Sequence, residues 1–101
     1  MAERRLELHA DARAEYLEAL DWYLQRSELV ARRFQEDLIA TLSRIAARPE
    51  LAAADEAGIR WARMDRFPHI LYYRIQDDET VQVLAVAHGR RRPGYWGSRL
   101  T

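Results

Sequence analysis

The sequence predicts an α+β fold in which a helical hairpin packs on one face of a mainly antiparallel sheet. Changes in the spacing of apolar residues indicate this arrangement. Apolar and polar residues alternate near the N-terminus, apolar residues then recur every three or four positions as far as Pro49, and the alternation returns after Gly58. The expected order is therefore an N-terminal strand, two helices and three further strands.

The N-terminal strand is expected at residues 5–9, where Leu6 and Leu8 alternate with polar side chains. A first helix follows, with the carboxylate of Asp11 as its N-cap and an apolar face at positions 16, 19, 20, 23 and 24. The spacing of this apolar face predicts that the helix packs on the sheet.

Ser27 is expected to cap the second helix, which Pro49 ends. Its apolar stripe falls at positions 30, 34, 38, 42 and 45. The opposite face, which includes Asp37, carries charges of both signs and is expected to lie in solvent.

Residues 48–57 are expected to form a loop with at most one helical turn. Alternation of Ile59 and Trp61 predicts the second strand, and Phe67-Pro68 predicts a bend. Two apolar runs, 69–75 and 81–87, are joined by a polar turn of hairpin length. Strict alternation within 81–87 places apolar residues on both faces, which is typical of a central strand covered on both sides.

Length and composition limit the possible classes of protein. The chain has 101 residues, 49% of them hydrophobic, and no cysteine. We therefore expect one domain over residues 1–101, without disulfides or thiolate chemistry. Residues 1–11 lack the apolar stretch of an export signal, and no apolar run approaches the length of a membrane helix, so a cytoplasmic location without membrane association is expected.

Charge is divided unevenly along the chain, although the net charge is zero. Residues 1–56 carry 8 Arg against 12 acidic residues, a net of −4, and residues 57–101 carry 8 Arg against 4 acidic residues, a net of +4. From Thr80 onward there are four arginines and no acidic residue. The C-terminal end is therefore expected to attract an anion or an acidic partner.

The densest group of chemically versatile residues is 88–96, directly after the predicted central strand. It contains His88, three consecutive arginines, Tyr95 and Trp96. These residue types can carry protons, bind phosphate and stack on bases, as an RNA-binding or RNA-cleaving site requires. The same pattern also fits a solvated strand end in which His88 is a hydrogen-bonded structural residue and Trp96 packs on the sheet.

Metal and cofactor sites are not expected. The three histidines are far apart in the sequence, and none forms a helical pair with metal-ligand spacing. The chain also lacks a phosphate-binding glycine loop, a nucleophile elbow and a dinucleotide-binding motif.

Several segments together resemble the RelE/ParE superfamily of bacterial type II toxins, most closely its ParE-like branch. The match spans nearly the whole chain and agrees with the predicted fold. The segments that carry it are Leu6–His9, Glu18–Tyr23, the helix around Phe34, Gly58–Arg60, Arg66–Ile75 and Val83–Arg91.

The resemblance implies a growth-inhibiting toxin that a cognate antitoxin neutralises, of the kind associated with plasmid stabilisation. The ParE-like branch poisons DNA gyrase without an established catalytic residue, and the RelE-like branch cleaves messenger RNA on the ribosome. RelE-like nucleases tend to carry extra basic residues along the middle strands. Here residues 59–64 supply only Arg60 and Arg63, and residues 70–73 supply none, which favours gyrase as the target. A nontoxic antitoxin-binding module is a further alternative.

The resemblance and the charge pattern select one group of residues for binding the target or the antitoxin. This group consists of Arg60, Arg90, Arg91, Arg92, Tyr95, Trp96 and Arg99.

If the chain is instead an endoribonuclease, Arg90 or Arg92 would stabilise the phosphate charge, and Tyr95 with His88 would move the proton.

Overall fold

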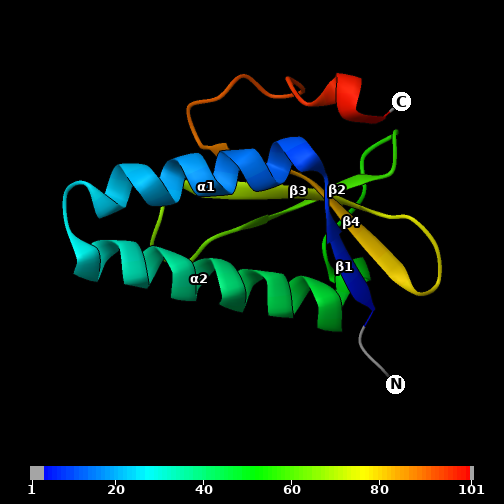
Figure 1. Ribbon diagram of the computed structural model, residues 1–101. Helices are drawn as coiled ribbons and strands as arrows, with labels where there is room; N and C mark the ends of the chain where they lie inside the picture. The colour runs from blue at the N-terminus through cyan, green and yellow to red at the C-terminus, as the bar shows by residue number, and fades with distance from the viewer. Residues whose placement is uncertain (1–3, 101) are drawn as a thin grey trace.

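The computed structural model describes residues 4–100, and their elements follow the predicted order (Figure 1). Two predictions involve terminal residues that lie outside this range. They are the single domain over residues 1–101 and the absence of an export signal in residues 1–11. The elements are β1 (Arg5–Leu8), α1 (Ala10–Leu24), α2 (Glu28–Ala47), β2 (Ile59–Arg63), β3 (His69–Ile75) and β4 (Thr80–His88), with short 3₁₀ turns at Pro49–Leu51 and Gly97–Leu100. The α+β prediction is confirmed.

The four strands form one sheet in the order β1-β4-β3-β2. β1 pairs with β4 in parallel, and β2, β3 and β4 are successive antiparallel neighbours. β4 is thus an inner strand, as the sequence predicted. The helical hairpin provides the crossover from β1 to the rest of the sheet, and the C-terminal segment turns back along the direction from which β4 came (Figure 1).

The start of α1 differs from the prediction. The N-cap is His9, whose Nδ1 atom accepts a hydrogen bond from the Asp11 backbone N–H at 3.0 Å. An imidazole nitrogen thus takes the place of the expected carboxylate, and Asp11 lies in the first turn. The cap of α2 is as predicted: Ser27 Oγ accepts from the Val30 N–H at 3.2 Å.

Asp37 was expected in solvent, and the structure shows that this is wrong. The residue is only 7% exposed. Its carboxylate accepts hydrogen bonds from the backbone N–H groups of Asp65 and Arg66, at 3.1 and 2.8 Å, in the turn between β2 and β3. Asp37 therefore joins α2 to the sheet, a long-range role that charge alternation along one helix does not reveal.

Two apolar clusters lie on opposite faces of the sheet. The larger one joins Phe34 and Leu38 of α2 to Tyr73, Val83 and other residues of the sheet. The smaller one joins the sheet to the C-terminal segment through Trp96, which packs with Ile59, Leu84 and Ala85. The helical hairpin covers one face of the sheet, and the C-terminal segment 94–100, here called the tail, covers part of the other.

An irregularity in β4 overturns the expected alternation of its side chains. Ala85 pairs with Tyr72 and Val83 pairs with Tyr73, so Leu84 is an extra residue, a β-bulge. Val83 and Val86 consequently belong to the helix-side cluster, while Leu84 and Ala85 both belong to the tail-side cluster. Strict alternation along the sequence would instead place Ala85 on the same face as Val83, and Leu84 on the same face as Val86 and His88.

None of the helices in residues 4–100 is both long and apolar enough to cross a membrane.

Candidate functional site

The segment Gly89–Pro93, here called the arginine loop, leaves the end of β4. The Gly89 N–H donates to the Pro68 carbonyl at 2.6 Å, and the Arg90 N–H donates to His88 Nδ1 at 3.1 Å. His88 is therefore hydrogen-bonded and also exposed. The arginines are exposed as well, and within residues 4–100 the side chains of Arg90 and Arg92 have no ion-pair partner. Two cations of the loop are thus free to meet an anionic surface.

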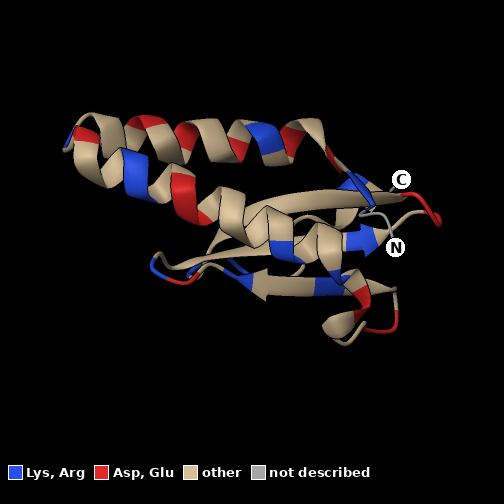
Figure 2. Ribbon diagram, turned by 90° about the horizontal axis from the view of Figure 1, so that it is seen from below, with Lys and Arg blue, Asp and Glu red and all other residues tan. Residues whose placement is uncertain are grey.

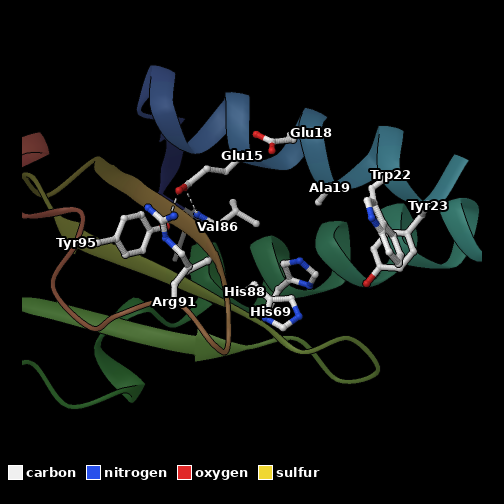
Figure 3. A pocket seen from close by; sticks show the side chains of 11 residues that line it. Glu15, Glu18, Ala19, Trp22, Tyr23, His69, Val86, His88, Arg91 and Tyr95 are labelled. Atoms are coloured by element: carbon white, nitrogen blue, oxygen red, sulfur yellow. Dashed lines mark hydrogen bonds between the residues drawn. The ribbon is translucent and has the colours of Figure 1, made fainter. Parts of the chain in front are cut away.

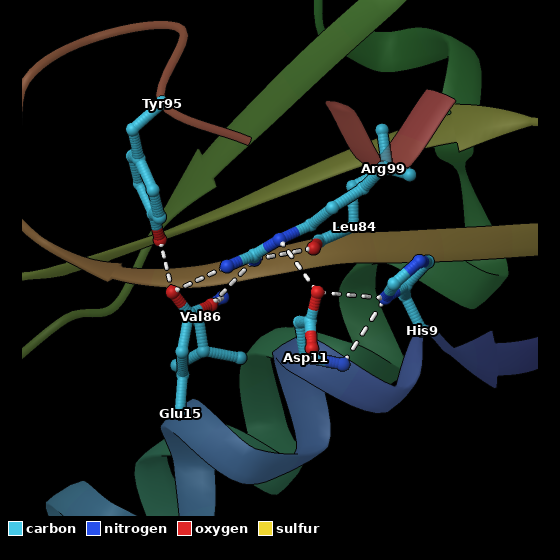
Figure 4. Close-up of polar contacts among 7 residues, drawn as sticks. All are labelled: His9, Asp11, Glu15, Leu84, Val86, Tyr95 and Arg99. Atoms are coloured by element: carbon cyan, nitrogen blue, oxygen red, sulfur yellow. Dashed lines mark hydrogen bonds and ion pairs between the residues drawn. The ribbon is translucent and has the colours of Figure 1, made fainter. Parts of the chain in front are cut away.

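A cluster of three residues, here called the clasp, holds the segment that follows the loop (Figure 4). The carboxylate of Glu15 in α1 accepts from the Tyr95 hydroxyl at 2.5 Å and from both terminal nitrogens of Arg99, at 2.9 and 3.1 Å. Arg99 also lies 3.5 Å from Asp11 through its Nε atom. The two-pronged contact of a guanidinium with a carboxylate is among the stronger polar contacts in proteins.

The clasp provides hydrogen-bond partners for backbone groups of β4 that have no partner on β1. β1 ends at Leu8, opposite Val83, so β4 has no neighbouring strand on that side beyond this point. There the Leu84 carbonyl accepts from Arg99 at 2.9 Å, and the Val86 N–H donates to Glu15 at 3.0 Å. Because buried backbone groups require partners, Glu15 and Arg99 take the place of a neighbouring strand.

The clasp shifts the proton affinities of its members. Burial alone would raise the pKa of Glu15, but hydrogen bonds from Arg99, Tyr95 and Val86 outweigh it and hold that pKa below its usual value. Burial and the adjacent Glu15 carboxylate raise the pKa of Tyr95 well above that of a free phenol. Tyr95 is therefore a neutral hydrogen-bond donor near neutral pH, and Glu15 is ionised.

Aromatic contacts connect the clasp to the loop and to the sheet. The Arg91 guanidinium carbon lies 4.1 Å from the centre of the Tyr95 ring. Trp96, only 7% exposed, packs against Tyr72 with ring centres 5.2 Å apart. One of the three loop arginines is thus stacked, and Trp96 is part of the core.

A groove of about 450 Å³ runs between α1 and the end of β4. Figure 3 shows Tyr95, Arg91 and Glu15 at one end of the groove, Trp22 and Tyr23 at the other, and the two histidines between them. Glu18, Ala19, Val86 and Ala87 complete the lining. The groove therefore combines apolar walls with charges of both signs.

His69 and His88, treated as distant on the basis of the sequence, are cross-strand neighbours, with ring centres 5.4 Å apart. Burial, and secondarily the charge of His88, lowers the pKa of His69 to about 4. Its Nδ1 atom is buried without a hydrogen-bond partner in residues 4–100. Within residues 4–100, no group of three or more His, Cys, Asp or Glu side chains is placed so that it could hold a metal ion.

Arg60 is not part of this site. It pairs in register with Tyr73 in the half of the sheet away from the end of β4, and its guanidinium donates to the carbonyls of Glu50 and Ala52 at 3.2 and 2.5 Å. These contacts hold the loop after α2. Figure 2 shows charges of both signs along the two helices and an acidic turn between β3 and β4, at the end of the sheet opposite the arginine loop.

The structure thus brings together six of the seven residues selected from the sequence but divides them by role. Arg90, Arg91 and Arg92 are exposed, whereas Tyr95, Trp96 and Arg99 are held by internal contacts. Sequence reasoning missed Glu15 as the partner of Arg99. The absence of acidic residues after Thr80 was a usable signal, because a partly buried arginine in this tail needs a carboxylate from elsewhere.

Comparison with known proteins identifies the family. The sequence model of one protein family, described as the ParE toxin of the type II toxin–antitoxin system parDE, matches residues 6–93 of this chain. The chain belongs to the ParE toxin family. The matched range includes the arginine loop and ends before Tyr95, so the ParE family match covers only one member of the clasp, Glu15.

A solved structure is similar to this ParE-type toxin over most of its length. It is a chain from the chromosomal ParDE toxin–antitoxin system of P. aeruginosa, with a TM-score of 0.72 and 18% sequence identity. The alignment covers 85% of this chain and 96% of that one. At this identity the match shows a shared fold. A comparison with curated proteins gives no match.

Proposed function

We propose that this ParE-type toxin arrests growth in the cytoplasm by binding and poisoning DNA gyrase, and that it performs no chemistry of its own. The observation that carries the proposal is the arginine loop. Three consecutive cations follow the inner strand, two of them are free of internal partners, and all lie within the ParE-matched range. Such a cluster favours an anionic protein or nucleoprotein surface.

The state of Tyr95 supports a binding role over ribosome-dependent cleavage of messenger RNA. A catalytic phenol must accept or release a proton, but this hydroxyl donates to Glu15 and its pKa is raised. Arg99 is likewise occupied by Glu15 and the Leu84 carbonyl. We therefore assign target contacts to Arg90, Arg91 and Arg92, and a supporting role to Tyr95, Trp96 and Arg99.

The experiment compares purified wild-type toxin with the Arg90→Ala/Arg92→Ala double variant in gyrase binding and supercoiling assays. The double variant should bind at least about tenfold more weakly, because each lost contact to a charged group is worth on the order of 1 kcal/mol or more. Arg32→Ala/Arg33→Ala, which removes two exposed cations from α2, is the matched control and should bind as wild type does. Equal loss in both double variants would contradict a specific role for the loop.

A second assay addresses the nuclease alternative. Wild-type toxin incubated with translating ribosomes should leave messenger RNA intact. Cleavage that disappears in the Tyr95→Phe variant would reject the gyrase proposal and make Tyr95 a catalytic residue.

The antitoxin is the second partner, since the family is that of a toxin–antitoxin system. We propose that it binds the groove and the arginine loop with an acidic, amphipathic segment. The apolar walls would hold its apolar side chains, and Arg91 at one end would pair with an acidic one. Trp22 is 51% exposed beside this groove, so Trp22→Ala should weaken antitoxin binding, as measured by titration calorimetry, while Trp61→Ala on β2 should not.

A further inference from the structure

The arginine loop is anchored at both ends. At its start, the backbone of β4 and the Gly89 contact to Pro68 fix the chain. Beyond its end, Tyr95 and Arg99 are bound to Glu15, and Trp96 is buried against Tyr72. A short exposed segment between two fixed points loses little conformational freedom on binding, which strengthens association without adding contacts.

Glu15 is the residue on which the second anchor converges. Its carboxylate accepts from Tyr95, Arg99 and the Val86 N–H, and so joins α1, β4 and the tail at one point. It lies on α1, outside the arginine loop, and its side chain is 22% exposed. Arg91 extends this connection into the loop by stacking on the Tyr95 ring.

We propose that Glu15, acting through Tyr95 and Arg99, is a positioning residue for target recognition: it fixes the arginine loop in its binding conformation without contacting the target. This inference rests on the proposed role of the loop in target binding. The tail, which lies beyond the ParE-matched range, thereby has a function in target binding. So does the Glu15 carboxylate, which no charge pattern in the sequence selects.

Tyr95→Phe tests the inference most cleanly. The substitution removes only the hydroxyl that donates to Glu15, and it keeps the ring, the Arg91 stacking position and every charge of the protein. We expect about a tenfold loss of gyrase affinity, the scale of one charge-assisted hydrogen bond. Glu15→Gln, which keeps the side chain's length but loses one acceptor oxygen and the charge, should cost more.

The salt dependence of gyrase affinity distinguishes a positioning residue from a residue that contacts the target. The Arg90→Ala/Arg92→Ala variant loses charges at the interface, so its affinity should depend less on salt than that of wild type. Tyr95→Phe should bind more weakly at every salt concentration with the wild-type slope. Hydrogen exchange should be faster in residues 90–98 of Tyr95→Phe and unchanged in α2.

A purely structural clasp would give a different result. In that case Tyr95→Phe would lower the melting temperature, yet the folded protein would bind gyrase with wild-type affinity and inhibit growth equally at equal protein levels. This outcome would overturn the positioning role.

The growth assay also separates the two proposals. If wild-type toxin arrests growth but does not bind gyrase, the proposed target is wrong. The clasp is then judged by growth inhibition alone, which Tyr95→Phe and Glu15→Gln should weaken. A wild-type chain that does not inhibit growth would overturn both proposals.

Discussion

At the scale of single residues, the environment of His69 makes stability depend on pH. The imidazole is 5% exposed and faces Tyr23, Phe34 and His88. Its pKa is lowered from 6.5 to about 4 in the folded protein. Between these values the unfolded chain binds a proton that the folded protein does not, so stability falls as the pH falls through this window.

We therefore predict a loss of up to roughly 3 kcal/mol in the free energy of unfolding between pH 7 and pH 4 from this residue. Urea denaturation at several pH values measures it. His69→Phe, which suits the aromatic surroundings, should flatten the dependence, whereas His88→Gln should retain most of it. An unchanged pH dependence in His69→Phe would show that other groups cause it.

Asp37 provides a second test at this scale. Asp37→Ala leaves two backbone N–H groups in the turn between β2 and β3 without their acceptor, and it should lower the free energy of unfolding by about 2 kcal/mol. Glu36→Ala, one position earlier and exposed, is the control and should change it by less than about 0.5 kcal/mol. Equal stability of the two variants in urea denaturation would contradict the anchoring role.

At the scale of elements, the exit of β4 depends on Gly89. A Cβ atom at this position would lie 3.0 Å from the Pro68 carbonyl oxygen, a backbone atom that cannot move independently. Gly89→Ala should therefore separate the arginine loop from the β2–β3 turn and lower stability by about 1 kcal/mol. Gly97→Ala, where a Cβ would meet nothing within 4 Å, is the matched control for thermal unfolding.

The order and type of the elements were predictable because each follows from local periodicity. Ser27 and Pro49 also marked the limits of α2 correctly, since a cap and a helix breaker act on adjacent backbone. Features set by contacts between distant segments were not predictable. The bulge at Leu84 depends on pairing with β3, and it reversed the expected side-chain faces of the second half of β4.

The site shows the same division between local and distant information. The sequence identified the arginine cluster because its members are consecutive. It did not reveal that Glu15 binds Arg99, because 84 residues separate them in the chain. The proximity of His69 and His88 likewise follows from strand register, which composition and spacing do not determine.

At the scale of the whole molecule, the segments that hold the fold together lie apart from the arginine loop, which we propose binds the target. The helical hairpin and the tail cover opposite faces of the sheet, and the tail is bound to α1 through the clasp. The arginine loop lies at one end of the sheet and the acidic β3–β4 turn at the other. This polarity would orient the loop toward an anionic target during approach.

DNA gyrase is the proposed target of this ParE-type toxin, and binding alone is proposed to inhibit it. Pulse labelling of DNA and protein synthesis, in the minutes after the toxin is induced without antitoxin, tests it most directly. If gyrase is the target, we expect DNA synthesis to stop first and protein synthesis to continue for a time. If protein synthesis stops first, the gyrase account is contradicted and messenger RNA becomes the target.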